Sequence, residues 1–233
     1  MHISNFTEKM QQIAPRELKM DYDNVGLLIG PEKQEIRRVL VALDCTSVTA
    51  KEAIEWGADL MLTHHPVFFR GTKRIAPDDP ATAGAYMLIR HGIGLFAAHT
   101  NLDAAEDGVN DALAEALGVQ NAVPMEPDGL GRIGTLAAPV SFGTFAKTVE
   151  EKLNTAVRIS GEIDRIISRV AVIGGAAGGI LVAAHSNDAY DRPLSTYTYA
   201  AARFLQVSGV RVELDVSTGS CFYDLIGGIA IRA

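Results

Sequence analysis

The chain has 233 residues, of which 48% are hydrophobic and 21% are charged, and this ordinary globular composition argues against a disordered, collagen-like or coiled-coil protein. Its formal net charge is −7 at pH 7 and it has no long block of basic residues, so a nucleic-acid backbone finds no electrostatic partner. The two cysteines lie far apart in the sequence, so we expect no disulfide. No long apolar run predicts a membrane span, and the N-terminus lacks the apolar region of a signal peptide, so we expect a cytoplasmic protein without membrane contacts.

The first 120 residues alternate between patterns typical of helices and patterns typical of buried strands. In chain order, they predict a helix over 3–13, a strand over 36–44, a helix over 46–57, a strand over 58–65, a helix over 79–92, a strand over 93–99 and a helix over 108–118. Strands and helices that alternate with short links are typical of a parallel sheet with crossover helices. We therefore predict an α/β fold with parallel or mixed sheets.

After Gly118 the alternation repeats more loosely. A helix is predicted over about 141–153, and a strand pattern beginning at 169 runs into the glycine-rich stretch 173–180, "IGGAAGGI". That stretch matches neither the dinucleotide-binding pattern nor the P-loop with its lysine, so a tight strand-to-helix turn is favoured over a phosphate-binding loop. We predict a two-part fold. Its main domain comprises residues 1–120 and 169–233, and residues 121–168 form a small inserted lobe.

Three of the six histidines lie at the ends of predicted strands. His64 and His65 end the strand "ADLMLTHH", and His99 ends the strand "IGLFAAH". Ligands collect at the carboxyl ends of strands in parallel sheets, so the three imidazoles are expected on one rim. Neighbouring strand residues point to opposite faces, and Pro66 breaks the strand where both imidazoles must turn outward.

Carboxylates follow the third histidine closely. Asp103 lies four residues after His99, and Glu106 follows in the same segment, which we expect to be a loop before Gly108. Imidazole and carboxylate together suit zinc, iron, manganese or nickel. One interpretation is a divalent metal bound by the adjacent histidines and Asp103, with His99 or Glu106 moving a proton. The alternative, that each histidine is a hydrogen-bonded structural residue, is less favoured because four ligand-type side chains converge.

Three motifs resemble those of a known family. "DNVGLLIG", "LTHHPVFF" and "AAHTNLDAAEDGVNDALAEALG" are similar in order and spacing to the Ngg-interacting-factor-three-like family, also known as GTP cyclohydrolase 1 type 2 homologues. The resemblance covers about residues 1–120, and "RVAVIGGAAGG" is similar to the start of the family's closing segment. It implies a two-part α/β fold, a toroidal homohexamer and a dinuclear metal centre. By this resemblance His64 and His65 each bind one metal, Asp103 bridges the two, and His99 lies beside them.

The C-terminal part departs from the family's pattern. The family completes its site with a histidine and a glutamate four residues later, but these positions hold Thr218 and Phe222 here. Three explanations stay open. Glu213, Asp215 or His185 replaces a missing ligand, the site binds one metal or none, or the C-terminal segment follows a different course.

Two functions are compatible with these residues. The leading hypothesis is a metal-dependent hydrolase acting on a small nucleotide-like or phosphate-bearing molecule, because a bound metal makes hydroxide available at neutral pH. The cyclohydrolase activity itself follows from the resemblance alone, since no residue selects GTP. The alternative is a non-catalytic ring scaffold or metal-binding regulator with a degraded site, which the missing C-terminal ligands favour. The expected partners are a small-molecule substrate and further copies of the chain in a hexamer.

Overall fold

The computed structural model describes all residues except 126–128, 158, 160, 175–210, 216–230 and 233. The chain forms two compact units, one of Met1–Leu102 with Tyr197–Ala233 and one of Asp103–Thr196. Each unit contains its own sheet. The domain boundaries predicted at residues 120 and 169 stay predictions. No helix in the described ranges has the length and apolar character that crossing a membrane requires.

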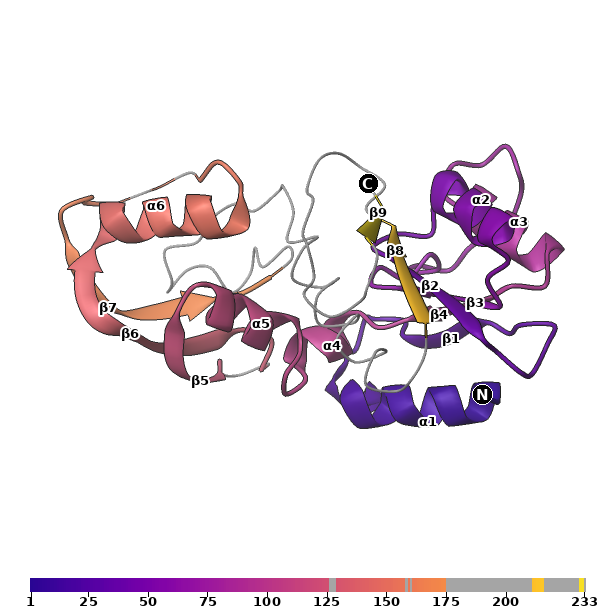
Figure 1. Ribbon diagram of the computed structural model, residues 1–233, viewed down its shortest axis with the longest axis horizontal. Helices are drawn as coiled ribbons and strands as arrows, with labels where there is room; N and C mark the ends of the chain where they lie inside the picture. Colours follow the sequence, from indigo (N-terminus) through magenta and orange to yellow (C-terminus); the bar gives the residue numbers. More distant parts are fainter. Residues whose placement is uncertain (126–128, 158, 160, 175–210, 216–230, 233) are drawn as a thin grey trace. The chain divides into compact units, whose positions relative to one another are not determined.

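The first unit is built on a mixed sheet, whose described strands follow the order β1-β4-β3-β2-β8-β9. The strands are β1 (Gly26–Ile29), β2 (Arg38–Ala42), β3 (Leu60–Thr63), β4 (Gly94–Ala97), β8 (Arg211–Asp215) and β9 (Ile231–Arg232). Neighbouring strands run parallel except β1 and β4, which pair antiparallel. The predicted α/β fold with a mixed sheet and crossover helices is confirmed (Figure 1).

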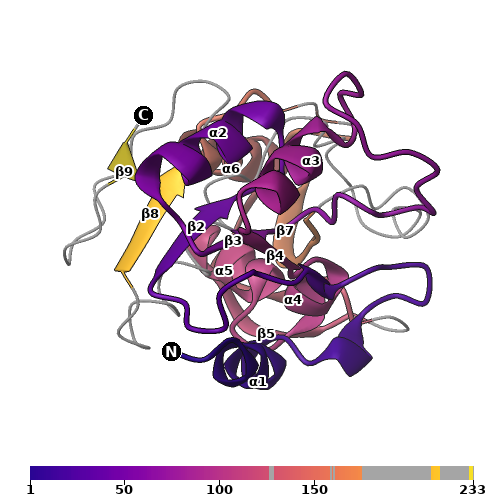
Figure 2. The same ribbon diagram turned by 90° about the vertical axis from the view of Figure 1, so that its right-hand side faces the viewer.

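Helices cover both faces of this sheet. They are α1 (Ile3–Ile13), the short 3-10 helix η1 (Arg16–Leu18), α2 (Ser47–Trp56) and α3 (Ala83–Arg90). The helices α2 and α3 lie on one face and α1 lies on the other (Figure 2). Successive residues of β4 contact the two layers, as the alternation of a strand requires. Leu95 joins the core cluster that contains residues of α2 and α3, whereas Phe96 packs edge-to-face on Phe6 of α1 with ring centroids 5.7 Å apart.

Local signals determine where α2 begins and ends. The Thr46 hydroxyl accepts from the Thr49 N–H at 3.1 Å, and the Thr49 hydroxyl accepts from the Thr46 N–H at 2.9 Å. Gly57 ends the helix in the left-handed region, with φ 72°. The next helix approaches closely, because a Cβ at Gly84 would lie 2.6 Å from the carbonyl oxygen of Cys45. Glycine at this position therefore lets α3 pack against the segment that leads into α2.

The second unit has an antiparallel sheet in the order β5-β6-β7. Its elements are α5 (Val109–Ala116), β5 (Val119–Pro124), β6 (Arg132–Ser141), α6 (Phe142–Leu153) and β7 (Ile166–Val172). The predicted helix over 141–153 corresponds to α6, which Ser141 caps by accepting from the Thr144 N–H at 3.2 Å. Leu113 of α5, Val149 of α6 and Val170 of β7 share one core. The looser alternation after residue 118 therefore forms an antiparallel sheet with its own core.

A short helix, α4 (Thr100–Ala104), occupies part of the segment that the sequence predicted to be a loop. Its end depends on a distant side chain, because Arg132 of β6 donates from Nη2 to the carbonyl oxygens of Ala104 at 3.1 Å and Ala105 at 2.8 Å. The same buried guanidinium pairs with Asp111 through Nε at 2.5 Å and Nη2 at 3.0 Å. The carbonyl groups at the helix end thus find donors that the local sequence does not reveal.

Candidate metal centre

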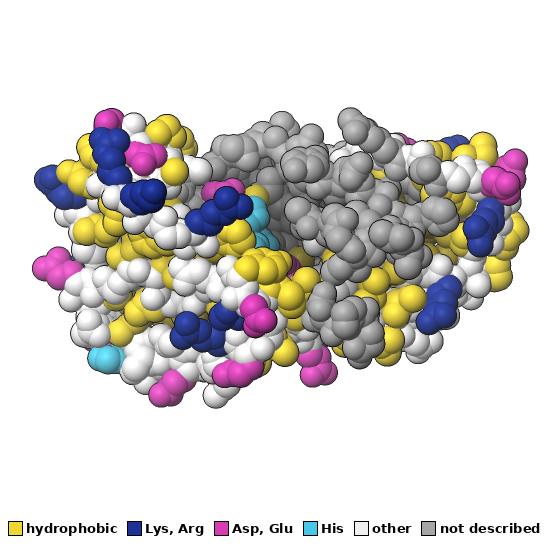
Figure 3. Space-filling view, turned by 180° about the vertical axis from the view of Figure 1, so that it is seen from behind, with side chains coloured by type: hydrophobic (Ala, Val, Ile, Leu, Met, Phe, Trp, Pro, Cys, Tyr) yellow, Lys and Arg dark blue, Asp and Glu magenta, His cyan; other side chains and the backbone are white. Residues whose placement is uncertain are grey.

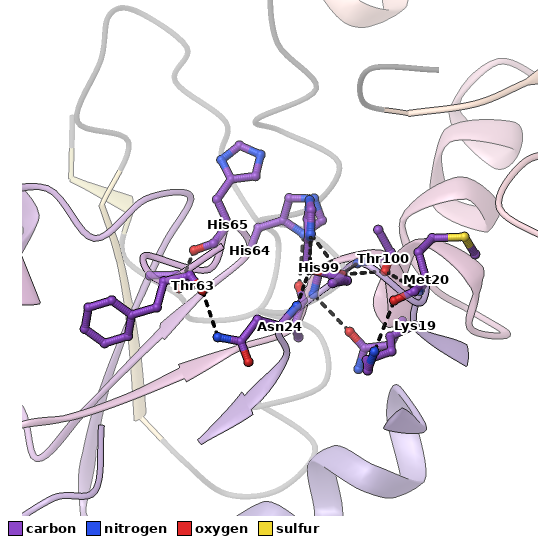
Figure 4. A network of polar contacts seen from close by, with 12 residues as sticks. Lys19, Met20, Asn24, Thr63, His64, His65, His99 and Thr100 are labelled. Carbon is purple, nitrogen blue, oxygen red and sulfur yellow. Dashed lines mark hydrogen bonds and ion pairs between the residues drawn. The ribbon is translucent and has the colours of Figure 1, made fainter. Parts of the chain in front are cut away.

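Three histidines come together where two neighbouring parallel strands end. His64 and His65 directly follow β3, and His99 follows β4 after one intervening residue. The two strands pair in register as far as Thr63 and Ala97, so they leave the sheet at the same level. One ligand-type nitrogen of each imidazole lies within 4.8 Å of the others. The expected convergence of the three rings on one rim is observed (Figure 4).

His64 is the buried member of the cluster. Its Nδ1 lies 3.0 Å from the carbonyl oxygen of Ala98, which accepts the ring proton. Burial holds the pKa of His64 well below its usual range, and the neighbouring rings of His99 and His65 lower it further. The ring is therefore neutral at pH 7, which is the state in which imidazole binds a metal.

His65 is the exposed member, with 47% of its side chain accessible to solvent. Its Nδ1 lies 2.8 Å from Oδ1 of Asp44, which stands two residues after the end of β2. The backbone fixes this residue as well, because its N–H donates to the carbonyl of Leu43 at 3.0 Å and its carbonyl accepts from the Thr63 hydroxyl at 3.0 Å. The ring of His65 is therefore oriented by the neighbouring strand β2.

His99 is oriented by a carboxylate with no exposed surface. Its Nδ1 lies 3.0 Å from each oxygen of Asp23. The same carboxylate accepts from the Thr100 N–H at 3.1 Å, from the Thr100 hydroxyl and from the Asn24 N–H at 2.8 Å. Burial acts to raise the pKa of Asp23, but the hydrogen bonds from His99 and Thr100 outweigh it and hold the pKa below its usual range. Asp23 is therefore ionised at neutral pH.

In all three histidines, Nδ1 faces an oxygen atom that accepts hydrogen bonds and donates none. Of the two neutral tautomers of imidazole, such an acceptor selects the one with its proton on Nδ1 and its lone pair on Nε2. Backbone carbonyls and carboxylates hold metal-binding imidazoles in this way, and they raise the basicity of the coordinating nitrogen. A set of imidazole donors suits zinc, iron or nickel. The residues present therefore fit a divalent metal.

The two predicted carboxylates lie beyond His99. Asp103 is buried in α4, and its carbonyl oxygen accepts from Nδ2 of Asn110 at 3.1 Å. Glu106 is exposed in the turn between α4 and α5. Both residues belong to the second unit, whereas the histidines belong to the first. Metal binding by Asp103 and proton transfer by Glu106 therefore stay predictions.

Several sequence predictions concern residues that the structure does not describe. Thr218, Phe222 and His185 lie outside the described residues. Glu213 and Asp215 belong to β8, of which only the backbone is described. Most of the glycine-rich stretch 173–180 also lies outside the described residues. Within it, the N–H of Gly174 donates to Oδ1 of Asn110 at 2.7 Å.

Sequence reasoning missed the two carboxylates that orient the histidines. Asp44 follows a strand whose carboxyl end lies at the same rim, so the rule that located the histidines would also have located it. Asp23 precedes β1, and its hydrogen bond to His99 joins residues 76 positions apart. No local pattern marks that pairing.

Comparisons with known proteins agree with this fold. The Duf34/NIF3 (NGG1p interacting factor 3) family matches residues 1–190. The chain is 34% identical over 182 residues to the "GTP cyclohydrolase 1 type 2 homolog" of Clostridium perfringens, covering 75% of this chain and 70% of that protein. It is 35% identical over 189 residues to the protein of the same name from Streptomyces coelicolor, covering 76% and 66%. The two matches thus span about two thirds of each relative's length.

A solved structure shows the same fold at low sequence identity. A crystal structure of a Staphylococcus aureus hypothetical protein superposes with a TM-score of 0.77 at 24% identity, over 97% of this chain and 99% of that one. This likeness concerns the fold, because the sequences have diverged far.

Proposed function

The chain belongs to the Duf34/NIF3 family, and we propose that it is a metal-dependent hydrolase acting on a small nucleotide-like or phosphate-bearing molecule. One observation carries this proposal: three imidazoles gather within 4.8 Å, and the Nδ1 atom of each faces an oxygen acceptor. Three structural histidines would satisfy their polar groups separately and would not need to share a rim. The names of the relatives support a nucleotide-like substrate, since they are homologues of a GTP cyclohydrolase.

The proposed metal ligands are His64, His65 and Asp103. When bound, the metal supplies a water of lowered pKa and a positive charge that polarises the scissile bond. The chain's own residues position the ligands. The Ala98 carbonyl holds the ring of His64, and the Asp44 carboxylate holds the ring of His65. In this proposal two ions are held per subunit.

The proposed general base is His99. With its proton on Nδ1 donated to Asp23, its Nε2 is the nitrogen that takes a proton from an attacking water. The ionised Asp23 then stabilises the imidazolium that forms, because it carries the opposite charge 3.0 Å away. Glu106, an exposed carboxylate on the turn after α4, is the alternative base. If the His99→Gln variant keeps full turnover and the Glu106→Gln variant loses it, Glu106 and not His99 is the general base.

The experiment that tests the proposal measures metal content and turnover together. Elemental analysis of the purified protein is expected to find a divalent transition metal, and His64→Ala is expected to lose most of it. His91→Ala is the matched control, because His91 is exposed at the end of α3 and its Nδ1 also faces a carbonyl, that of Met87. A screen of nucleotides and phosphoesters with added Mn²⁺, Zn²⁺ or Fe²⁺ should then reveal turnover that Asp103→Ala abolishes.

Two results would contradict this function in different ways. A protein that holds no metal, with His64→Ala indistinguishable from the unmodified chain, would remove the metal centre. A protein that retains metal but turns over no substrate in the screen would favour the non-catalytic scaffold, which the residues Thr218 and Phe222 at the family's ligand positions also favour. Sedimentation measurements address the predicted homohexamer independently of both.

A further inference from the structure

Two exposed aromatic side chains lie in contact near the histidine cluster. Tyr22 is 66% exposed and Phe69 is 39% exposed, and their ring centroids are 6.0 Å apart in an edge-to-face arrangement. Among the large apolar side chains that are exposed in the described part of the chain, these two are the aromatic ones. Single exposed apolar residues are ordinary on protein surfaces. Contiguous exposed apolar surface is what marks binding sites, and the contact between the two rings makes their exposed surfaces contiguous.

The aromatic pair adjoins the candidate metal centre. The ring of Phe69 packs edge-to-face on His99, with centroids 5.9 Å apart, and His99 lies 5.0 Å from His64 by the same measure. Tyr22 also immediately precedes Asp23, the residue that orients His99. The four rings therefore form a continuous row from the exposed Tyr22 to the buried His64.

A side-chain hydrogen bond holds the two aromatic loops together. Nδ2 of Asn24 donates to the carbonyl oxygen of Phe68 at 2.9 Å, which ties the segment after Tyr22 to the segment before Phe69. The fold therefore fixes the relative position of the two rings, because a hydrogen bond between residues 44 positions apart joins their loops. Its position next to His99 follows from two anchors, the Asn24 amide and the Asp23 carboxylate.

Basic residues follow the aromatic pair along the chain. Arg70, Lys73 and Arg74 are exposed within five residues after Phe69, although the chain as a whole carries a net charge of −7. Arg74 pairs with Asp78 on the surface. On the face drawn in Figure 3, histidine side chains reach the surface beside hydrophobic and basic side chains. A ligand that has both a planar ring and a phosphate would match these two kinds of residue.

We propose that Tyr22 and Phe69 form an aromatic platform for a purine or similar planar heteroaromatic ring of the substrate, which stacks on one of the two rings and meets the edge of the other, next to the histidine cluster. This inference rests on the proposed function and names the class of molecule that the site takes. Aromatic side chains bind bases through their π-faces, and each stacked base contributes about 1–3 kcal/mol. A sugar or an aliphatic group has no π-face and gains much less. The platform would hold the ring at one side of His99 while the rest of the molecule extends toward the other histidines.

The test compares two ligands that differ by the base alone, GMP and ribose 5-phosphate. Their affinities are measured by titration calorimetry on the purified protein, with and without added Zn²⁺. Tyr22→Leu and Phe69→Leu, which remove a ring but keep an apolar side chain, are each expected to weaken GMP binding about fivefold to tenfold. Ribose 5-phosphate should bind these variants as it binds the unmodified chain. Tyr22→Phe keeps the ring and should restore GMP affinity, and Ile89→Ala, at an exposed position on α3, serves as the control.

Three results would overturn the platform. In the first, GMP binds the unmodified chain no more tightly than ribose 5-phosphate does. In the second, both ring-removing variants keep full GMP affinity. In the third, Tyr22→Leu would change the sedimentation coefficient without changing GMP affinity, which would make the pair a contact between copies of the chain. Metal content separates this inference from the proposed function. A metal-containing protein with unaltered GMP affinity in the variants loses only the platform, whereas a metal-free protein that shows the ring effect loses only the metal centre.

Discussion

Replacing Asp23 with asparagine tests how strongly the buried acceptor behind His99 stabilises the site. The Asp23 carboxylate receives only donors, namely the His99 ring, the N–H and hydroxyl of Thr100 and the N–H of Asn24. Asparagine has nearly the same shape but carries no charge, and in either orientation its NH₂ group replaces an oxygen that accepts hydrogen bonds. At least one donor is then left facing another donor in a buried place.

The expected size of the effect follows from burial. A hydrogen bond to a charged group contributes about 1.5–3 kcal/mol, and a buried donor left without an acceptor costs about 1–3 kcal/mol. Since asparagine keeps one oxygen, we expect Asp23→Asn to lower the free energy of unfolding by about 2–4 kcal/mol. Asp44→Asn is the matched control, because Asp44 holds His65 in the same way but both side chains are about half exposed. Exposed pairs contribute about 0.2–1 kcal/mol, so this variant should lose at most about 1 kcal/mol.

Urea unfolding of the metal-free protein at pH 7, followed by circular dichroism, measures both losses. Because the pKa of Asp23 is lowered below its ordinary 3.8, its stabilising contribution is complete above about pH 4 and is lost as the pH falls through the lowered pKa. The measurement at pH 7 therefore records it in full. Equal losses for the two variants, or a loss below about 1 kcal/mol for Asp23→Asn, would refute the argument from burial.

Three further predictions concern the scaffold around the site. Arg132→Met should lower the free energy of unfolding by about 3 kcal/mol, because Asp111 and several carbonyl groups lose their donor. A loss below about 1 kcal/mol in urea unfolding would show that water replaces the guanidinium. Gly84→Ala should lose about 1–3 kcal/mol in the same assay, since its Cβ would meet backbone oxygen at 2.6 Å, and an unchanged midpoint would contradict that close contact. Burial raises the pKa of Cys45 to about 12, so in a Cys221→Ser variant a thiol reagent at pH 8 should label Cys45 only after unfolding; rapid labelling of the native protein would disagree.

Much of the first unit was predictable from local signals. Pro15 ends the first helical pattern, and α1 stops at Ile13. The pattern over 46–57 predicts Thr46 or Ser47 as the N-cap of this helix and Gly57 as its C-cap, and the structure shows Thr46 and Gly57 at the ends of α2. These predictions succeed because a cap acts within one turn of its helix. The helix α4 was missed because its last carbonyl groups bind Arg132, which lies 28 residues after Ala104.

The histidines of the site were predictable for a different reason. The carboxyl end of each parallel strand lies at the same edge of the sheet, so a residue's place at the end of a strand already gives its place in the site. This rule needs no knowledge of which strand neighbours which. It locates His64, His65 and His99, and it would also have located Asp44.

The acceptor behind His99 required the strand order itself. β1 follows the first helix in the chain, but in the sheet it pairs antiparallel with β4, and Gly26 at the start of β1 lies opposite Ala97 at the end of β4. Asp23 lies three residues before the start of β1, so this pairing places it beside the residues that follow β4, which include His99 and Thr100. A pairing of β1 with β2, its nearest strand in sequence, would have left His99 without this carboxylate. The base proposed for the reaction therefore depends on the one antiparallel pair among the described strands of this sheet.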